Sequence, residues 1–264
     1  MKVFARVICS VAVAISLSAI QAGAAGTNSL TLGGSPYTQN FDGMGTLSAS
    51  APLGWNAGTL TGASTTNGII NSVAVLNNNT GNSTTSGNFN YGSSGAADRA
   101  IGSLAASTTT RATEVLFVNN TGTTITNLTI SYDGEQWRDG GTATATDQLT
   151  MAFSQATAGG LTNFTAMGTS FNFVVPKNGS SATALDGNLA ANRIAGIGGA
   201  YAVSIAAGEV FVFRWIDADT AGNDDGMAID NFSLAYDAIP EPSTILLVGL
   251  GLIGTFSICR RRAK

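Results

Sequence analysis

The oxygen-bearing side chains of this sequence are most densely spaced between residues 217 and 230. Residues 217–226 read DADTAGNDDG, and Asp230 follows. Carboxylate and amide oxygens at this density, with glycines that permit tight turns, are typical of calcium sites. The segment is not an EF-hand, because Ala221 and Ala228 stand where the fifth and twelfth ligands belong. We therefore expect a structural calcium site or, as the alternative, a solvated acidic turn, and the candidate ligands are Asp217, Asp219, Asn223, Asp224, Asp225 and Asp230.

A second group of carboxylates lies in the segment DGEQWRD, after a predicted strand that ends near residue 132. Its members are Asp133, Glu135 and Asp139. Two carboxylates at a defined separation would suit glycoside hydrolysis, but a sequence does not give that separation, and a turn with an ion pair is the alternative. We expect a protein that is not an enzyme, with a carboxylate-dependent glycoside hydrolase as an alternative function.

The composition excludes several kinds of chemistry. The chain has no histidine, which removes the usual zinc sites, the serine–histidine–aspartate triad and the commonest general base. Its two cysteines, Cys9 and Cys259, lie near the two ends, so no disulfide framework is expected between them. Residues 25–239 hold six basic and fifteen acidic residues, a net charge of −9, which repels nucleic acid and attracts divalent cations.

The elements that must position these residues are predicted to be β-strands. Gly, Ser, Thr, Asn and Ala dominate, and the apolar residues come in strand-sized groups without long helical periodicity. The pattern predicts an all-β, jelly-roll-like antiparallel sandwich over residues 25–238. The polar stretch 77–88 is expected to be an exposed loop or hairpin tip. The predicted strands cover residues 37–41, 68–76, 99–104, 113–118, 124–132, 148–154, 171–175, 200–205, 210–216 and 227–236.

The predicted strand at residues 210–216 alternates regularly. Because side chains point to opposite faces in turn, one face holds Phe211, Phe213 and Trp215, and the other holds Val212, Arg214 and Ile216. Both faces are apolar apart from Arg214, so we expect a central strand that is covered on both sides. A buried arginine needs a carboxylate partner, and we expect Glu135 or Asp133 to form this structural ion pair.

Two further patterns bear on ligand binding. Trp55 in the segment PLGWN is expected on a loop as an exposed, ligand-facing aromatic, while burial in the core is the alternative for the aromatic residues in general. Residues 142–146 read TATAT, in which threonine alternates with alanine. An ice-binding face would repeat such a regular row of threonines, and this sequence contains a single copy of it. A threonine-rich edge or loop is the alternative there.

Both ends of the sequence are predicted to be targeting segments. In residues 1–24, Lys2 and Arg6 precede an apolar stretch and a small-residue AGA pattern, which predicts a secretory signal peptide read by the Sec translocon and signal peptidase. Residues 243–258 are uncharged and slightly shorter than the roughly 20 residues of a comfortable membrane span. The basic residues that follow them would hold the C-terminus in the cytoplasm, with the domain outside.

The order of parts at the C-terminus carries a resemblance. Pro-Glu-Pro, a short glycine-containing apolar helix and an arginine cluster closely resemble the PEP-CTERM sorting signal of Gram-negative bacteria, and the matching residues are Pro240, Glu241, Pro242, Arg260, Arg261 and Arg262. The resemblance implies that segment 239–264 anchors the protein transiently in the inner membrane. It also implies that an exosortase, a membrane protease-transpeptidase, cuts near the Pro-Glu-Pro and releases the domain towards the cell surface or an exopolysaccharide matrix. A plain single-pass membrane anchor is the alternative.

The body of the chain carries a second, looser resemblance. Segments FDG at 41–43, SYDGEQWR at 131–138 and GMAIDNF at 226–232 resemble jelly-roll modules of laminin-G or carbohydrate-binding type in secreted bacterial proteins. In such modules the opening and closing strands are often neighbours, so the resemblance implies that Asp42 lies near Asp230 and joins the candidate calcium ligands. The expected function is a non-enzymatic surface or biofilm-matrix protein, with binding of extracellular polysaccharide or ice as the alternative.

Overall fold

The computed structural model describes residues 30–33, 36–61, 69–73, 75–106, 108–144, 146–155, 161 and 163–239. The predicted signal peptide and the predicted hydrophobic helix at the C-terminus lie outside these residues. Within them, no helix has the length and apolarity needed to cross a membrane.

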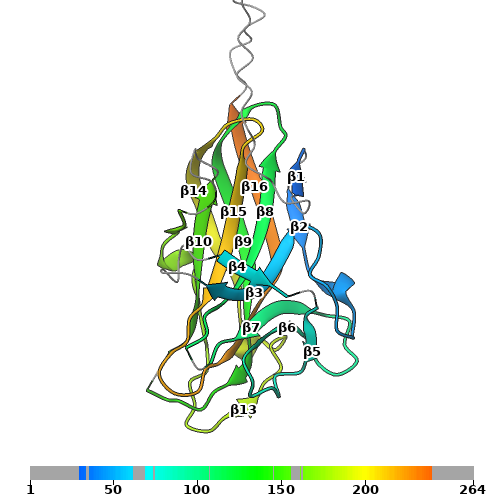
Figure 1. Cartoon of the computed structure of the whole chain (residues 1–264), viewed down its shortest axis with the longest axis vertical. Coiled ribbons are helices and arrows are strands. Elements are labelled where there is room, and N and C mark those ends of the chain that lie inside the picture. The colour runs from blue at the N-terminus through cyan, green and yellow to red at the C-terminus, as the bar shows by residue number, and fades with distance from the viewer. Residues whose placement is uncertain are drawn as a thin grey trace, which may run out of the picture.

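The fold is a sandwich of two eight-stranded sheets, which we call sheet A and sheet B (Figure 1). Sheet A contains β1 (Leu30–Leu32), β3 (Trp55–Thr61), β4 (Ile69–Ser72), β8 (Arg111–Asn119), β10 (Gln148–Gln155), β11 (Thr165–Ala166), β12 (Phe173–Val174) and β15 (Val210–Asp217). Sheet B contains β2 (Tyr37–Gln39), β5 (Asn77–Asn79), β6 (Gly87–Tyr91), β7 (Ala100–Leu104), β9 (Thr124–Asp139), β13 (Thr183–Ala184), β14 (Arg193–Ile205) and β16 (Gly226–Ile239). Short 3-10 helices are present at Asp42–Met44 (η1), Thr169–Phe171 (η2) and Ala190–Asn192 (η3).

Successive long strands alternate between the two sheets. The chain passes from β7 in sheet B to β8 in sheet A, then to β9 and β10, and later from β14 to β15 to β16. Most pairings are antiparallel, and the parallel ones are the short pairs β1–β8 and β5–β6. This arrangement is the jelly-roll-like antiparallel sandwich that the sequence predicts.

Strand β15 lies between β8 and β10 in sheet A, and all of its residues are buried. Its odd-numbered aromatic residues join the main core between the sheets, where Phe232 of β16 packs against Trp215 at a centroid distance of 5.6 Å. Val212 and Ile216 join a smaller apolar cluster on the other face. The prediction of a central strand covered on both sides is confirmed.

A β-bulge in β16 sets which side chains of this strand face outwards. The pairing with β9 shifts in register between Asp230 and Ser233, and Asn231 has a φ of 48°. Because the extra residue reverses the alternation, Asp230 points to the outer face of sheet B while Phe232 enters the core. This outer face holds a further apolar cluster that contains Trp137, Tyr91 and Ala228.

Several predicted boundaries are wrong. Strands β3 and β6 were not predicted, and β9 continues to Asp139 rather than ending at residue 132. The polar stretch 77–88 is not a simple exposed loop, since Asn77–Asn79 pair with β6 and Asn79 is buried. Backbone pairing therefore recruits polar residues that carry no apolar pattern.

Candidate functional site

The acidic loop between β15 and β16 brings several carboxylates together at one end of the sandwich. Asp217, Asp224 and Asp225 are buried, Asp219 is half-buried and Asn223 is exposed. The sequence prediction missed a buried partner, Asp147, which lies just before β10. We call Asp147, Asp217, Asp224 and Asp225 the acidic-loop cluster.

Thr220 connects two members of this cluster. Its hydroxyl lies 2.5 Å from Asp147 Oδ1 and 2.9 Å from Asp224 Oδ1, and Asp225 N–H donates to Asp147 Oδ2 at 2.5 Å. Because a hydroxyl has one proton, it donates to only one carboxylate at a time.

Burial and like charge both disfavour ionisation in the acidic-loop cluster. Burial, followed by the charge of Asp224, raises the pKa of Asp217 to about 8. Burial and the charge of Asp147 raise the pKa of Asp225 to about 7. Asp217 accepts a hydrogen bond from the Ser103 hydroxyl at 2.6 Å, while its Oδ1 has no hydrogen-bond partner among the described residues.

The predicted calcium ligands divide into two groups. Burial is the main reason why the pKa of Asp230 rises to about 8, and the charges of Glu135, Asp98 and Asp42 raise it further. Strand β2 pairs with β16, so the opening and closing strands are neighbours, and the charge of Asp42 acts on Asp230. Among the described residues, no three acidic side chains form a group that could hold a metal ion. Calcium at the acidic loop stays a prediction.

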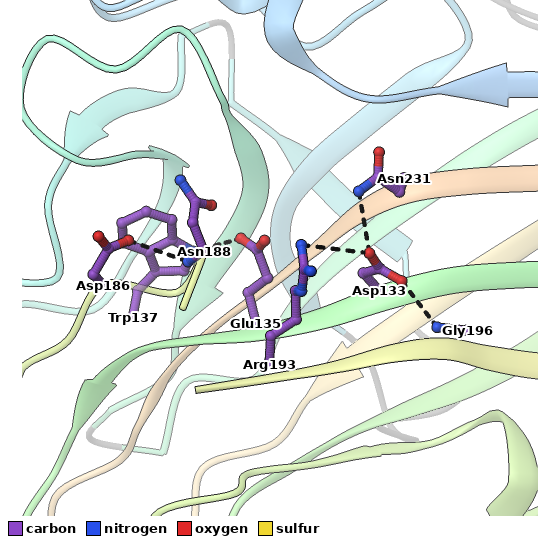
Figure 2. A network of polar contacts seen from close by, with 8 residues as sticks. All are labelled: Asp133, Glu135, Trp137, Asp186, Asn188, Arg193, Gly196 and Asn231. Atoms are coloured by element: carbon purple, nitrogen blue, oxygen red, sulfur yellow. Dashed lines mark hydrogen bonds and ion pairs between the residues drawn. The ribbon is translucent and has the colours of Figure 1, made fainter. Parts of the chain in front are cut away.

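The outer face of sheet B carries a network of polar side chains (Figure 2). Asp133 accepts hydrogen bonds from Gly196 N–H at 2.9 Å and from Asn231 Nδ2 at 3.1 Å, and it forms an ion pair with Arg193 at 3.8 Å. Glu135, two residues along β9, accepts a hydrogen bond from Trp137 Nε1 at 2.9 Å. Burial raises the pKa of Glu135 to about 7.

The predicted pairing of Arg214 with Glu135 or Asp133 is wrong. Arg214 pairs with Glu114, which lies directly across from it on β8, and the Nη2–Oε2 distance is 2.9 Å. The physical reason is the sheet register, because Arg214 faces the outer side of sheet A. Asp133 and Glu135 face the outer side of sheet B, so both sheets separate them from Arg214.

The prediction that Trp55 is an exposed, loop-borne aromatic is also wrong. Trp55 is the first residue of β3 and is 2% exposed. Its Nε1–H donates to the Tyr37 hydroxyl at 3.0 Å, which satisfies the one polar atom of the indole inside the core.

The last strand leads directly into the predicted sorting segment. Strand β16 ends at Ile239, which is 62% exposed, and Pro240 is the next residue. Residues 238–262 match the family model described as the PEP-CTERM protein-sorting motif. The chain carries a PEP-CTERM motif. This motif marks an exported protein, and it includes Pro240, Glu241 and Pro242, which lie outside the described residues.

The fold resembles carbohydrate-binding modules among solved structures, at low similarity. The CBM22-1 xylan-binding domain from Paenibacillus barcinonensis Xyn10C is 9% identical, with a TM-score of 0.41, over 78% of this chain and 97% of that domain. The CBM22-1–CBM22-2 tandem of the same protein gives 9% identity and a TM-score of 0.42, over 78% of this chain and 46% of that one. No curated protein matches the sequence significantly. Such a resemblance indicates nothing about what this chain binds.

Proposed function

We propose that this protein is a non-enzymatic domain that an exosortase-type membrane protease releases at the cell surface or into an exopolysaccharide matrix. The PEP-CTERM motif at residues 238–262 is the observation that carries the proposal. The motif begins where the fold ends, since β16 ends at Ile239. A cut near Pro240–Pro242 would leave every described strand intact, so the released domain would keep its core.

The surroundings of the carboxylates support a non-enzymatic role. Glu135 is fully buried and accepts a hydrogen bond from Trp137, while Asp133 accepts hydrogen bonds from Gly196 and Asn231. Asp139 is 5% exposed and accepts hydrogen bonds from Gly141 N–H and Gly179 N–H, both at 2.8 Å. Each of the three carboxylates considered for glycoside hydrolysis therefore forms hydrogen bonds within the domain and holds its backbone or side chains in place.

The release step can be tested by mass spectrometry of the protein recovered from cells with and without an exosortase. We expect a product that ends near Pro240–Pro242 only in exosortase-containing cells, and its loss on Glu241→Ala. Ser257→Ala, in the apolar run, is the matched control and should be processed normally. Equal processing of the wild type in both strains would overturn the proposal.

Polysaccharide binding is a second candidate, and one surface group favours it. The side chains of Arg193 and Asp133 are 31% and 14% exposed, and Asn231 beside them is exposed as well. Guanidinium, carboxylate and amide groups together suit hydrogen bonding to sugar hydroxyls. Co-sedimentation with insoluble polysaccharides should detect this binding. We expect it to weaken in Asn231→Ala and not in Asp237→Ala, a change at the far end of β16.

A further inference from the structure

Four buried oxygen atoms on the outer face of sheet B have no hydrogen-bond partner within the part of the chain that the structure describes. They are Glu135 Oε1, Asp230 Oδ1, Asn188 Oδ1 and Asn192 Oδ1. The residues Glu135, Asp230 and Asn192 are 0%, 2% and 4% exposed, and Asn188 is half-buried. A buried acceptor without a partner costs free energy, so four such acceptors on one face require a physical explanation.

Trp137 brings two of these residues, Glu135 and Asn188, to one place. Its Nε1–H donates to Glu135 Oε2, which leaves Oε1 of the same carboxylate free. Gly187 packs on the indole so closely that a Cβ there would lie 2.4 Å from Nε1. Asn188 is the next residue, and Figure 2 draws its side chain in the region between Trp137 and Glu135.

Asn192 is fixed to the same loop. Its Nδ2 donates to Asp186 O at 2.7 Å, one residue before Gly187, so the amide oxygen is the atom that remains without a partner. Asn192 ends η3, and the next residue, Arg193, pairs with Glu135 across β14 and β9. Asn192 thus lies one residue before the residue that pairs with Glu135.

Asp230 reaches the same face from the opposite side of β9. In the β9–β16 register Glu135 lies across from Ala228, and Asp230 lies across from Asp133. Glu135 and Asp230 are therefore diagonal neighbours, whose side chains are within reach of each other. Their charges act on each other, and the carboxylates around them exceed the arginines, with Asp42, Asp98, Asp133 and Asp186 against Arg99 and Arg193.

We propose that Glu135 Oε1, Asp230 Oδ1, Asn188 Oδ1 and Asn192 Oδ1 bind one divalent cation of the calcium class. We call this the Glu135 site. It combines two carboxylates with two amides, so it is compatible with the finding that no three acidic side chains converge among the described residues. Calcium takes six to eight oxygen ligands in flexible geometry, and backbone carbonyls or waters would complete the set.

Two protons, one on Glu135 and one on Asp230, are the competing explanation, because each carboxyl group then has an O–H that can donate to one amide oxygen. A cation differs in binding all four oxygens at once, and the calcium experiments below separate the two explanations. A water has two protons for four acceptors, and it leaves the negative charge of the carboxylates uncompensated.

Terbium luminescence tests the Glu135 site directly on the full-length protein in mild detergent. Tb³⁺ replaces calcium at oxygen sites and emits when a nearby indole is excited, and Trp137 is bonded to Glu135. We expect emission that added Ca²⁺ displaces and that Trp137→Phe removes. Trp55→Phe is the matched control, because Trp55 lies in the core between the sheets, and it should keep the signal. Absence of a calcium-displaceable signal in the wild type would overturn the proposal.

Two further variants separate this site from the acidic loop. Glu135→Gln should weaken Ca²⁺ binding by about tenfold or more, because the site loses one of its two formal charges. If binding survives Glu135→Gln and disappears in Asp224→Asn, the ion belongs to the acidic loop and the proposal is wrong. If Glu135→Gln does not fold, Asn188→Asp provides a second test. If the Glu135 site binds a cation, the Asn188→Asp variant should melt at a higher temperature than the wild type in Ca²⁺ and at a lower temperature in EDTA. If the site binds no cation, the variant should melt at a lower temperature than the wild type in both solutions.

Discussion

Trp55 and Trp215 stack in the core, with their ring centroids 5.7 Å apart and their planes inclined by 21°. Trp55 also meets Phe41 and Phe232 edge-on, at centroid distances of 4.8 Å and 5.4 Å. The stack therefore joins β3, β15 and β16 across the two sheets. Trp55 is an anchor of the core and does not face a ligand.

Trp55→Ala should lower the free energy of unfolding by about 3–5 kcal/mol, because it removes a large buried side chain and leaves a cavity. Urea denaturation followed by circular dichroism measures this change. Leu53→Ala, at a side chain that is 65% exposed, is the control and should stay within about 0.5 kcal/mol of the wild type. A Trp55→Ala variant as stable as the wild type would contradict the packing described here.

The sequence predicts the elements whose pattern is strongly periodic. The segment 210–216 alternates without interruption, and β15 forms where it is expected. By contrast, β3 reads WNAGTLT, in which Asn, Gly and Thr interrupt the apolar pattern, and Pro52 and Gly54 before it favour a turn. Its strand state comes from pairing with β8 and β4, which local sequence does not show.

The candidate sites are less predictable than the fold, because their partners come from distant parts of the chain. Glu114 faces Arg214 only through the register of β8 against β15. Asp147 and Asn192 are isolated in the sequence, and no motif distinguishes them from other loop residues. The acidic segment 217–226 does predict a carboxylate cluster, which the structure contains with Asp147 added.

Glu114→Ala should destabilise the protein by about 3–5 kcal/mol, the usual cost of removing one partner from a buried ion pair. Arg214 is 5% exposed in its side chain, and both its Nε and its Nη2 donate to Glu114 Oε2. Chemical denaturation gives the value. Asp133→Ala is the comparison, with an expected cost of about 1 kcal/mol, since its partner Arg193 is 31% exposed. Equal costs for the two variants would argue against the burial of the Arg214 pair as the cause.

The acidic-loop cluster predicts a dependence of stability on pH. Burial raises the pKa of Asp217 to about 8 and that of Asp225 to about 7, above the ordinary value of about 3.9. At a pH between the ordinary pKa and the raised pKa, the folded protein holds protons that the unfolded chain has released. The free energy of unfolding therefore falls as the pH rises through this range.

Melting in EDTA should therefore occur at a lower temperature at about pH 8.5 than at about pH 5.5. Asp217→Asn, whose side chain cannot ionise, should reduce the difference. Scanning fluorimetry across this range provides the measurement. A wild-type melting temperature that rises from the acidic to the basic end would show that these carboxyl groups ionise as easily in the folded protein as in the unfolded chain.

Gly187→Ala tests the packing of the loop on Trp137. A Cβ at this position would lie 2.4–2.9 Å from three atoms of the indole, so the loop or the ring must shift. We expect a loss of about 1–3 kcal/mol, typical of overpacking in a well-packed site. The near-ultraviolet circular dichroism should change as well, because Trp137 stacks on Tyr91 with centroids 5.7 Å apart. Gly43→Ala is the matched control, since nothing lies within 4 Å of the added atom. If both variants behave alike, Gly187 does not hold the loop against the indole, and the placement of Asn188 beside Glu135 loses its support.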